Sequence, residues 1–212
     1  RITMRGSLII ISFFIVGCLV GQIEDITSIL SSVPLEKYAL YVLLLLVGIS
    51  IGSNRRIKEL LLNIHPRMLL IPVATWVGTL MSAAIVALFF TRWSLFENMA
   101  IGSGFAYYSL SSILITDIKT PMIGVKLATE LGAIALIANI TREVITLTAT
   151  PLLVRYFGPL APICAGGATT MDTTLPIITQ YAGKEYAFVA IFHGIIIDLS
   201  VPLLVTLFCS LG

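Results

Sequence analysis

The chain has 212 residues, of which 58% are hydrophobic and 11% are charged, and its formal net charge is +2. Soluble domains carry about 25% charged residues, and the mean hydropathy of this chain is +1.02. These values exclude a soluble globular domain, a disordered chain and a nucleic-acid-binding protein. They indicate an integral membrane protein.

Seven apolar segments are long enough to cross a hydrocarbon core of roughly 30 Å as helices. Their ranges are 6–22, 38–53, 67–90, 96–116, 122–154, 160–180 and 186–210. Because apolar and polar residues do not alternate within them, the pattern predicts helices and not a barrel. We therefore predict an all-α polytopic membrane protein of about seven spans. No A-x-A-like cleavage site follows the first segment, so we interpret it as a span and not as a signal peptide.

The basic residues divide unequally between the two sides that seven spans define. One side has nine, namely Arg1, Arg5, Arg55, Arg56, Lys58, Arg67, Lys119, Lys126 and Lys184, and the other has Lys37, Arg92 and Arg155. The positive-inside rule then predicts a cytoplasmic N-terminus and an external C-terminus. Segment 122–154 is long enough for one tilted helix or two short ones. We predict one helix, because two would reverse all that follows and weaken the charge asymmetry.

Polar residues concentrate in the second half of the chain. The three spans within 1–92 are nearly featureless and have the composition of a scaffold, whereas 93–212 contains the candidate site. No linker rich in Pro, Gly or Ser separates these halves, so we predict a single transmembrane domain, 1–212. The three cysteines are far apart and the two histidines are 128 positions apart, so neither residue type predicts a metal site.

Segments 96–116 and 160–180 contain runs of small and hydroxyl residues at their centres. The first run is Gly102-Ser103-Gly104-Phe105-Ala106-Tyr107-Tyr108-Ser109-Leu110-Ser111-Ser112, and the second is Gly166-Gly167-Ala168-Thr169-Thr170-Met171-Asp172-Thr173-Thr174-Leu175-Pro176. Lipid cannot satisfy bare backbone groups, so unwound chain must face protein or a watery cavity. Two such segments are typical of secondary transporters with discontinuous helices. The alternative is that these small residues only pack against neighbouring helices.

Charged residues within the spans need a partner or a function, because each costs at least about 2.5–3.5 kcal/mol to insert. Segment 122–154 contains Glu130, Arg142 and Glu143. A polar stripe on one face of this helix consists of Asn139, Glu143, Thr146 and Thr150. Arg142 could neutralise Glu143 or Asp172, or form a purely structural ion pair. Glu130 could lie at the membrane surface.

The last span adds His193 and Asp198, which lie about 140° apart around a helix. Asp198 could line a pathway or hydrogen-bond to a neighbouring helix. His193 could titrate near neutral pH if it is hydrated, or could be a buried, hydrogen-bonded side chain.

At these motifs the sequence resembles the LysO lysine exporter family of bacteria. The resemblance depends on the two runs above, on Asn139-Ile140-Thr141-Arg142-Glu143, and on His193-Gly194 before Pro202. It implies export of L-lysine, and of analogues such as thialysine, across the inner membrane. Single-chain members look longer, and this chain resembles their later portion. We therefore expect half of an inverted-repeat bundle, completed by a small membrane subunit or by a second copy.

We predict alternating access around a site at the membrane midplane between segments 96–116 and 160–180. Backbone N–H groups near Gly166–Thr169 would bind the lysine carboxylate, and Asp172 or Glu143 would face an ammonium group. The candidate substrate-binding residues are Tyr108, Ser109, Ser111, Asn139, Glu143, Gly166, Gly167, Thr169, Thr170, Asp172 and Thr173. The candidate ion-coupling residues are Asp172, Glu143, Asp198 and Arg142, with H⁺ or Na⁺ as the ion and no other cofactor.

Three other function classes share some of these features. An ion antiporter, or an exporter of arginine or ornithine, could use the same charged residues. A membrane-embedded enzyme is disfavoured, because neither a rhomboid-like G-x-S-G nor an H-E-x-x-H motif is present. A purely structural subunit fits the first half of the chain but not the polar second half. We therefore predict a transporter and not an enzyme.

Overall fold

The computed structural model describes residues 66–89 and 92–212, and before them only Ser12, Val16, Leu19, Val20, Gln22, Tyr38, Val42, Leu45 and Ile49. The chain divides into two compact units, Arg1–Leu46 and Val47–Gly212. In the first unit the described residues are helical, apart from a turn at Gln22. The predicted spans 6–22 and 38–53 otherwise lie outside the described residues, so the fold below is that of the second unit.

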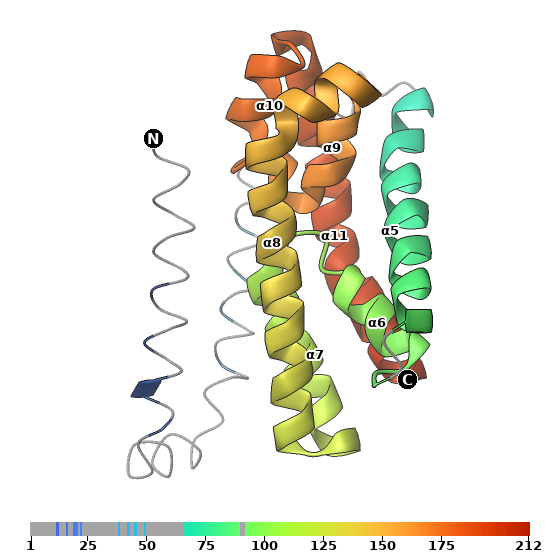
Figure 1. Ribbon diagram of the computed structural model, residues 1–212, viewed down its shortest axis with the longest axis vertical. Coiled ribbons are helices and arrows are strands. Elements are labelled where there is room, and N and C mark those ends of the chain that lie inside the picture. Colours follow the sequence, from blue (N-terminus) through green and yellow to red (C-terminus); the bar gives the residue numbers. More distant parts are fainter. Residues whose placement is uncertain are drawn as a thin grey trace. The chain divides into compact units, whose positions relative to one another are not determined.

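Three helices of this unit are long and apolar enough to cross a membrane, by length and composition, among the residues described. They are α5 (Leu70–Phe89), preceded by the 3₁₀ turn η1 (Pro66–Leu69), α8 (Val125–Phe157), and α11 (Ala187–Leu211) with its 3₁₀ turn η3 (Lys184–Tyr186). They extend along the long axis of the unit (Figure 1). The 33 residues of α8 form one continuous helix, which confirms the prediction for segment 122–154.

The long helices share two ends, called the first end and the second end. At the first end, Ile71 at the start of α5 packs near Ala190 at the start of α11. At the second end, Gly212 after α11 lies against Phe96, which follows α5 closely in the chain. Helix α8 runs from the second end to the first, because Glu130 in its second turn pairs with Arg92 at 2.6 Å.

The predicted span 96–116 is interrupted, and it returns to the end at which it began. Helix α6 (Leu95–Gly102) and helix α7 (Tyr108–Ile123) are separated by residues 103–107. Lys119 Nζ lies 2.8 Å from Glu97 Oε1, whereas a straight crossing would separate these residues by about 33 Å. The two helices therefore form hairpin 1, which enters from the second end (Figure 1).

The predicted span 160–180 also folds back. It consists of α9 (Ala161–Gly166), the 3₁₀ turn η2 (Gly167–Met171) and α10 (Leu175–Tyr181). Ile163 and Ile178 belong to one buried cluster near the first end, although a straight helix would place them about 22 Å apart. These elements form hairpin 2, which enters from the first end and lies in the opposite half of the unit from hairpin 1 (Figure 1).

These paths correct the seven-span prediction. The breaks at the centres of both segments are present, but neither segment passes from one end of the bundle to the other. Consequently Lys126 lies at the second end with Arg92, and Arg155 lies at the first end with Lys184. Lys119 is not a loop residue, since its side chain is fully buried against Glu97. Hydropathy does not distinguish a hairpin from a crossing segment, because both are apolar runs of similar length.

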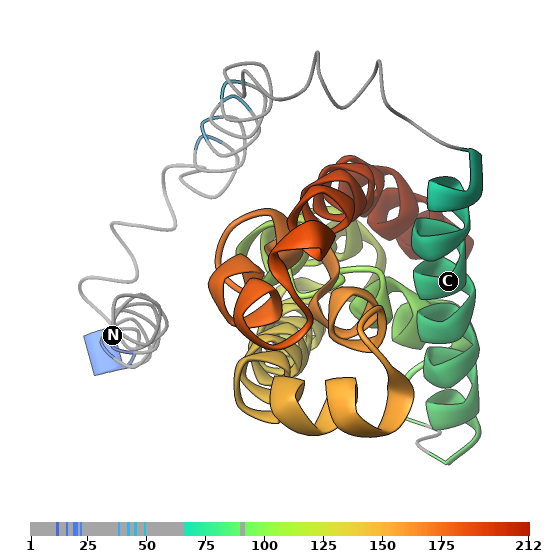
Figure 2. The ribbon, with the colours of Figure 1, turned by 90° about the horizontal axis from the view of Figure 1, so that it is seen from above.

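Helix α5 lies at the edge of the helical cluster (Figure 2). Pro72 and Thr75 are its only buried residues. Its inner face contacts α11 through a hydrogen bond of 2.9 Å from Trp76 Nε1 to Ser200 Oγ. The rest of α5 presents apolar side chains such as Val77 and Met81, which are 51% and 60% exposed and suit a lipid or protein neighbour.

The hairpin geometry predicts that the chain enters and leaves hairpin 1 on the same side of a membrane. In a cysteine-free background, Arg92→Cys and Lys126→Cys should be labelled by an impermeant maleimide from one side, and Arg155→Cys from the other. All three positions are exposed side chains, so the substitutions should cost little stability. Labelling of Arg92→Cys and Lys126→Cys from opposite sides would contradict the hairpin.

Candidate functional site

The tips of the two hairpins meet inside the bundle. The backbone N–H of Ala168 in η2 donates to the carbonyl of Phe105 between α6 and α7, at 2.9 Å. Gly167 has φ of +59°, and a Cβ atom there would lie 2.2 Å from the Phe105 oxygen. A side chain at this position would therefore separate the tips. Gly167, a predicted substrate-binding residue, is needed for this close approach.

The tip of hairpin 1 has an unusual backbone that α8 supports. Phe105 and Ala106 have φ of +43° and +72°, which non-glycine residues adopt only where surrounding contacts impose it. The Ala106 N–H donates to Asn139 Oδ1 at 2.8 Å. Asn139 Nδ2 donates in turn to the carbonyl of Ile101 at 3.0 Å. One amide side chain thus satisfies backbone groups on both sides of the helix break.

The tip of hairpin 2 is held by its own hydroxyl groups. Thr169 Oγ1 donates to the Gly166 carbonyl at 2.8 Å, and the Thr174 N–H donates to the Thr169 carbonyl at 3.0 Å. Asp172 accepts hydrogen bonds from the backbone and hydroxyl of Thr173. The predicted residues of this run therefore do lie together, at the point where the hairpins meet.

The amide groups near Gly166–Thr169 are poorly placed to bind a carboxylate. Ala168 N–H is already bonded to Phe105. This stretch also follows the C-terminus of α9, where exposed carbonyl groups make the potential negative. The carboxylate of an amino acid would need a different partner.

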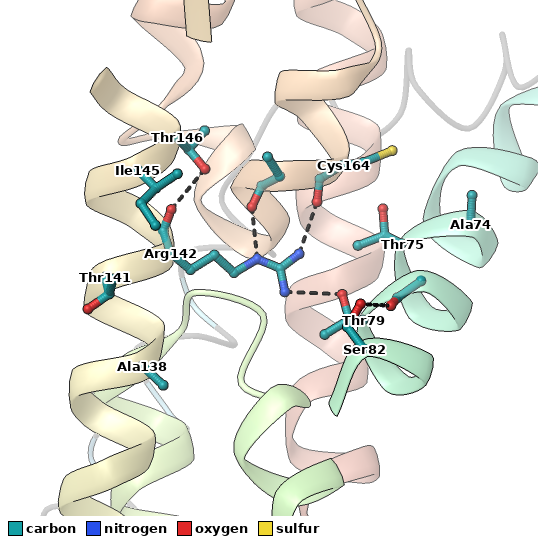
Figure 3. A pocket seen from close by; sticks show the side chains of 12 residues that line it. Ala74, Thr75, Thr79, Ser82, Ala138, Thr141, Arg142, Ile145, Thr146 and Cys164 are labelled. Carbon is teal, nitrogen blue, oxygen red and sulfur yellow. Dashed lines mark hydrogen bonds between the residues drawn. The ribbon is translucent and has the colours of Figure 1, made fainter. Parts of the chain in front are cut away.

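Arg142 binds the C-terminus of α9. Its Nε donates to the carbonyl of Ala165 at 2.8 Å and its Nη2 to that of Cys164 at 3.0 Å. Its Nη1 donates to Thr79 Oγ1 on α5 at 3.1 Å (Figure 3). The guanidinium lies 5.6 Å from the centre of the Phe105 ring. The sequence suggested an ion pair with Glu143 or Asp172. The described residues show carbonyl groups as its partners instead.

Three carboxylates lie near the tips, on α8, hairpin 2 and α11. Glu143 and Asp198 are buried, with 3% and 2% of their surfaces exposed, whereas Asp172 is exposed. Asp172 lies within Coulombic range of both other carboxylates. Within the part of the chain that the structure describes, Asp198 Oδ2 has no hydrogen-bond partner. No group of three or more His, Cys, Asp or Glu side chains among the described residues could hold a metal ion.

Two tyrosine side chains at the start of α7 lie near these carboxylates. Tyr108 lies within electrostatic range of Glu143 and Asp172, and Tyr107 of Asp172 and Asp198. Tyr107 was not among the predicted site residues, although its place beside the helix break could have indicated it. Ser109 is half-buried, whereas Ser111 is fully buried and bonded to the Tyr108 carbonyl.

His193 is a buried, hydrogen-bonded side chain, which confirms one of its two interpretations. It is fully buried on α11. Its Nε2 lies 2.8 Å from Thr75 Oγ1 on α5, and its Nδ1 lies 3.1 Å from Thr170 Oγ1 in η2. Thr170, a predicted substrate-binding residue, therefore connects hairpin 2 to α11, and through His193 to α5.

Two opposed hairpins whose tips meet beside buried carboxylates define a polytopic helical membrane protein of the transporter class. A family model described as "Lysine exporter LysO" matches residues 11–209. The chain belongs to the LysO lysine exporter family, which is a family of transporters and not of enzymes.

Two relatives support this assignment. A putative lysine exporter of Haemophilus influenzae is 34% identical over 176 residues, which cover 82% of this chain and 83% of that protein. The lysine exporter LysO of Escherichia coli K12 is 32% identical over 213 residues, which cover 99% of this chain and 67% of that protein. No solved structure matches.

Asn139→Leu should destabilise the protein by about 1–3 kcal/mol. It leaves the buried Ala106 N–H without its partner, while the Ile101 carbonyl keeps its bond from the Gly104 N–H. Thr148→Ala, at an exposed position of the same helix, is the control and should change little. Unfolding of the purified protein in detergent measures the difference, and equal stability of Asn139→Leu and wild type would contradict the role.

Proposed function

We propose that the protein exports L-lysine, and analogues such as thialysine, across the bacterial inner membrane in exchange for H⁺ or Na⁺. The observation that carries the proposal is the meeting of the two hairpin tips beside Glu143, Asp172 and Asp198. Carboxylates favour a cationic substrate, and both relatives are named as lysine exporters. The expected small subunit, or a second copy of the chain, stays a prediction.

The proposed orientation places the first end in the cytoplasm. Arg155 and Lys184 lie at that end, and Arg67 belongs to η1 just before α5. The sequence adds Arg55, Arg56 and Lys58, which precede η1 in the chain and lie outside the described residues. The second end has Arg92, Lys126 and the buried Lys119. The positive-inside rule still favours a cytoplasmic N-terminus and an external C-terminus, although the contributing residues differ from those predicted. Hairpin 1 then enters from outside and hairpin 2 from the cytoplasm.

The proposed mechanism is alternating access around the tips. Hairpin 1 with α8, and hairpin 2 with α11, run in opposite directions, which is the arrangement of an inverted repeat. Movement of hairpin 2 would open the site to the cytoplasm, and movement of hairpin 1 would open it to the outside. Asp172 and Glu143 would bind ammonium groups of the substrate, with Tyr108, Ser109 and Thr173 as hydrogen-bonding neighbours. Ser111, Asn139, Gly166, Gly167, Thr169 and Thr170 would shape the tips.

A cation/proton antiporter, or an exporter of another cationic amino acid, is the alternative. Asp198 suits it, because its Oδ2 has no hydrogen-bond partner among the described residues and a buried acid can carry H⁺ or Na⁺ without any amino acid. Uptake of labelled lysine, arginine or ornithine into inside-out vesicles, compared with ion flux alone, separates these functions. Ion flux that is independent of every amino acid would favour the antiporter.

Asp172→Asn should reduce lysine uptake into inside-out vesicles at least tenfold, because it removes the exposed carboxylate at the tips while keeping its volume. Glu185→Gln is the matched control, an exposed acidic residue outside the tips. It should retain wild-type uptake. Wild-type uptake by Asp172→Asn would exclude the proposed role.

Asp198→Asn should uncouple lysine transport from the movement of H⁺ or Na⁺. Removing the ionisable group should abolish lysine accumulation driven by an imposed H⁺ or Na⁺ gradient. Exchange of labelled for unlabelled lysine, which needs no net ion movement, should continue. Gradient-driven accumulation at the wild-type level would show that Asp198 is not the coupling residue.

A further inference from the structure

A groove of about 580 Å³ lies between α5 and α8, with part of α9 at its wall (Figure 3). Its volume is within the roughly 300–1,000 Å³ typical of small-molecule sites. Thr75, Thr79, Ser82 and Thr141 line it together with small apolar residues. At Gly78 a Cβ atom would meet nothing within 4 Å, so the groove is open beside this residue.

Arg142 is the charged residue of this groove. A guanidinium carries five N–H groups in a planar fork. Ala165, Cys164 and Thr79 accept one each, from Nε, Nη2 and Nη1. One N–H on each Nη atom therefore has no partner among the residues described. Capping of α9 therefore uses only part of the donor capacity of Arg142, a residue that lines the groove.

The charge of Arg142 is also not neutralised by a carboxylate. The ion pairs among the described residues are Arg92–Glu130 and Lys119–Glu97, and neither includes it. Carbonyl groups at a helix C-terminus offset roughly half a charge at most. A partly buried cation with free donors favours an anionic ligand, and planar carboxylates fit the guanidinium fork best.

The depth of Arg142 limits the kind of anion. Within α8 it lies 17 residues after Val125 and 15 before Phe157, which is about 25 and 22 Å from the two ends. Lipid phosphate groups remain at the membrane surfaces, so they do not reach this depth. A small solute that crosses the membrane, by contrast, must pass this depth.

We propose that Arg142 binds the α-carboxylate of the exported amino acid in this groove. The inference deepens the proposed function and depends on it. The groove supplies the anion-binding group for the substrate. The carboxylates proposed to bind its ammonium groups lie at the tips and do not line the groove. Arg142 thereby discriminates an amino acid from a diamine of similar length.

The first test compares lysine with 1,5-diaminopentane, which is lysine without its carboxylate. Calorimetric titration of the purified wild-type protein should show a Kd for the diamine at least tenfold higher than for lysine. In Arg142→Gln the ratio should fall to about one, because only lysine loses affinity, and Arg142→Lys should give an intermediate ratio. A purely structural role would weaken both ligands equally. An unchanged ratio in a folded Arg142→Gln variant would overturn the proposal.

The second test does not depend on the stability of Arg142 variants. Gly78→Phe places a ring in open space of the groove and should reduce lysine uptake at least tenfold. Val77→Phe, at an exposed neighbouring position outside the groove lining, is the matched control and should transport normally. Normal uptake by Gly78→Phe would overturn the proposal, and so would equal loss in both variants.

Failure of this inference is distinguishable from failure of the proposed function. If wild type transports no lysine, the proposed function is wrong. If wild type transports lysine but binds the diamine equally well, the function stands and the carboxylate site is wrong. If Arg142→Gln does not fold, the Gly78→Phe and Val77→Phe pair decides.

Discussion

The hydrogen bond from the Ala168 N–H to the Phe105 carbonyl joins two points inside the bundle at which α-helices are interrupted. In a membrane interior an unpaired backbone group costs several kcal/mol, so each tip requires partners outside itself. Hairpin 1 obtains them from Asn139, and the C-terminus of α9 obtains them from Arg142. Each hairpin therefore depends on contacts with the rest of the bundle.

Three polar residues close together on helix α8 have different chemical roles. Asn139 is neutral and satisfies backbone groups, Arg142 extends toward α9 and α5, and Glu143 is buried near the other carboxylates. Residues 142 and 143 project about 100° apart, so opposite charges adjacent in sequence face different surroundings. This separation explains why no ion pair forms between them, although Glu143 was one of the partners that the sequence suggested for Arg142.

Part of this arrangement could be predicted from the sequence. Small and hydroxyl residues indicated both helix breaks, and the stripe containing Asn139 and Glu143 indicated the buried face of α8. The path of each broken segment was not predictable, since the contact between Glu97 and Lys119 joins residues 22 positions apart without any local pattern. The partners of Arg142 were equally unpredictable, because they include backbone carbonyl groups, which every residue type has. Sequence identified the polar residues but not which of them face each other.

Because Asn139 satisfies backbone groups of hairpin 1, the order of synthesis affects how this hairpin folds. Residues 103–107 leave the ribosome before Asn139 and well before Ala168, which follows Phe105 by about 60 residues. At about 5–20 residues per second, the tip of hairpin 1 waits several seconds for the groups that satisfy it. During this interval α6 and α7 are two short, incompletely bonded helices beside α5. The buried pair of Lys119 and Glu97 is complete before α8 is synthesised, so it can hold the nascent hairpin closed until its partners arrive.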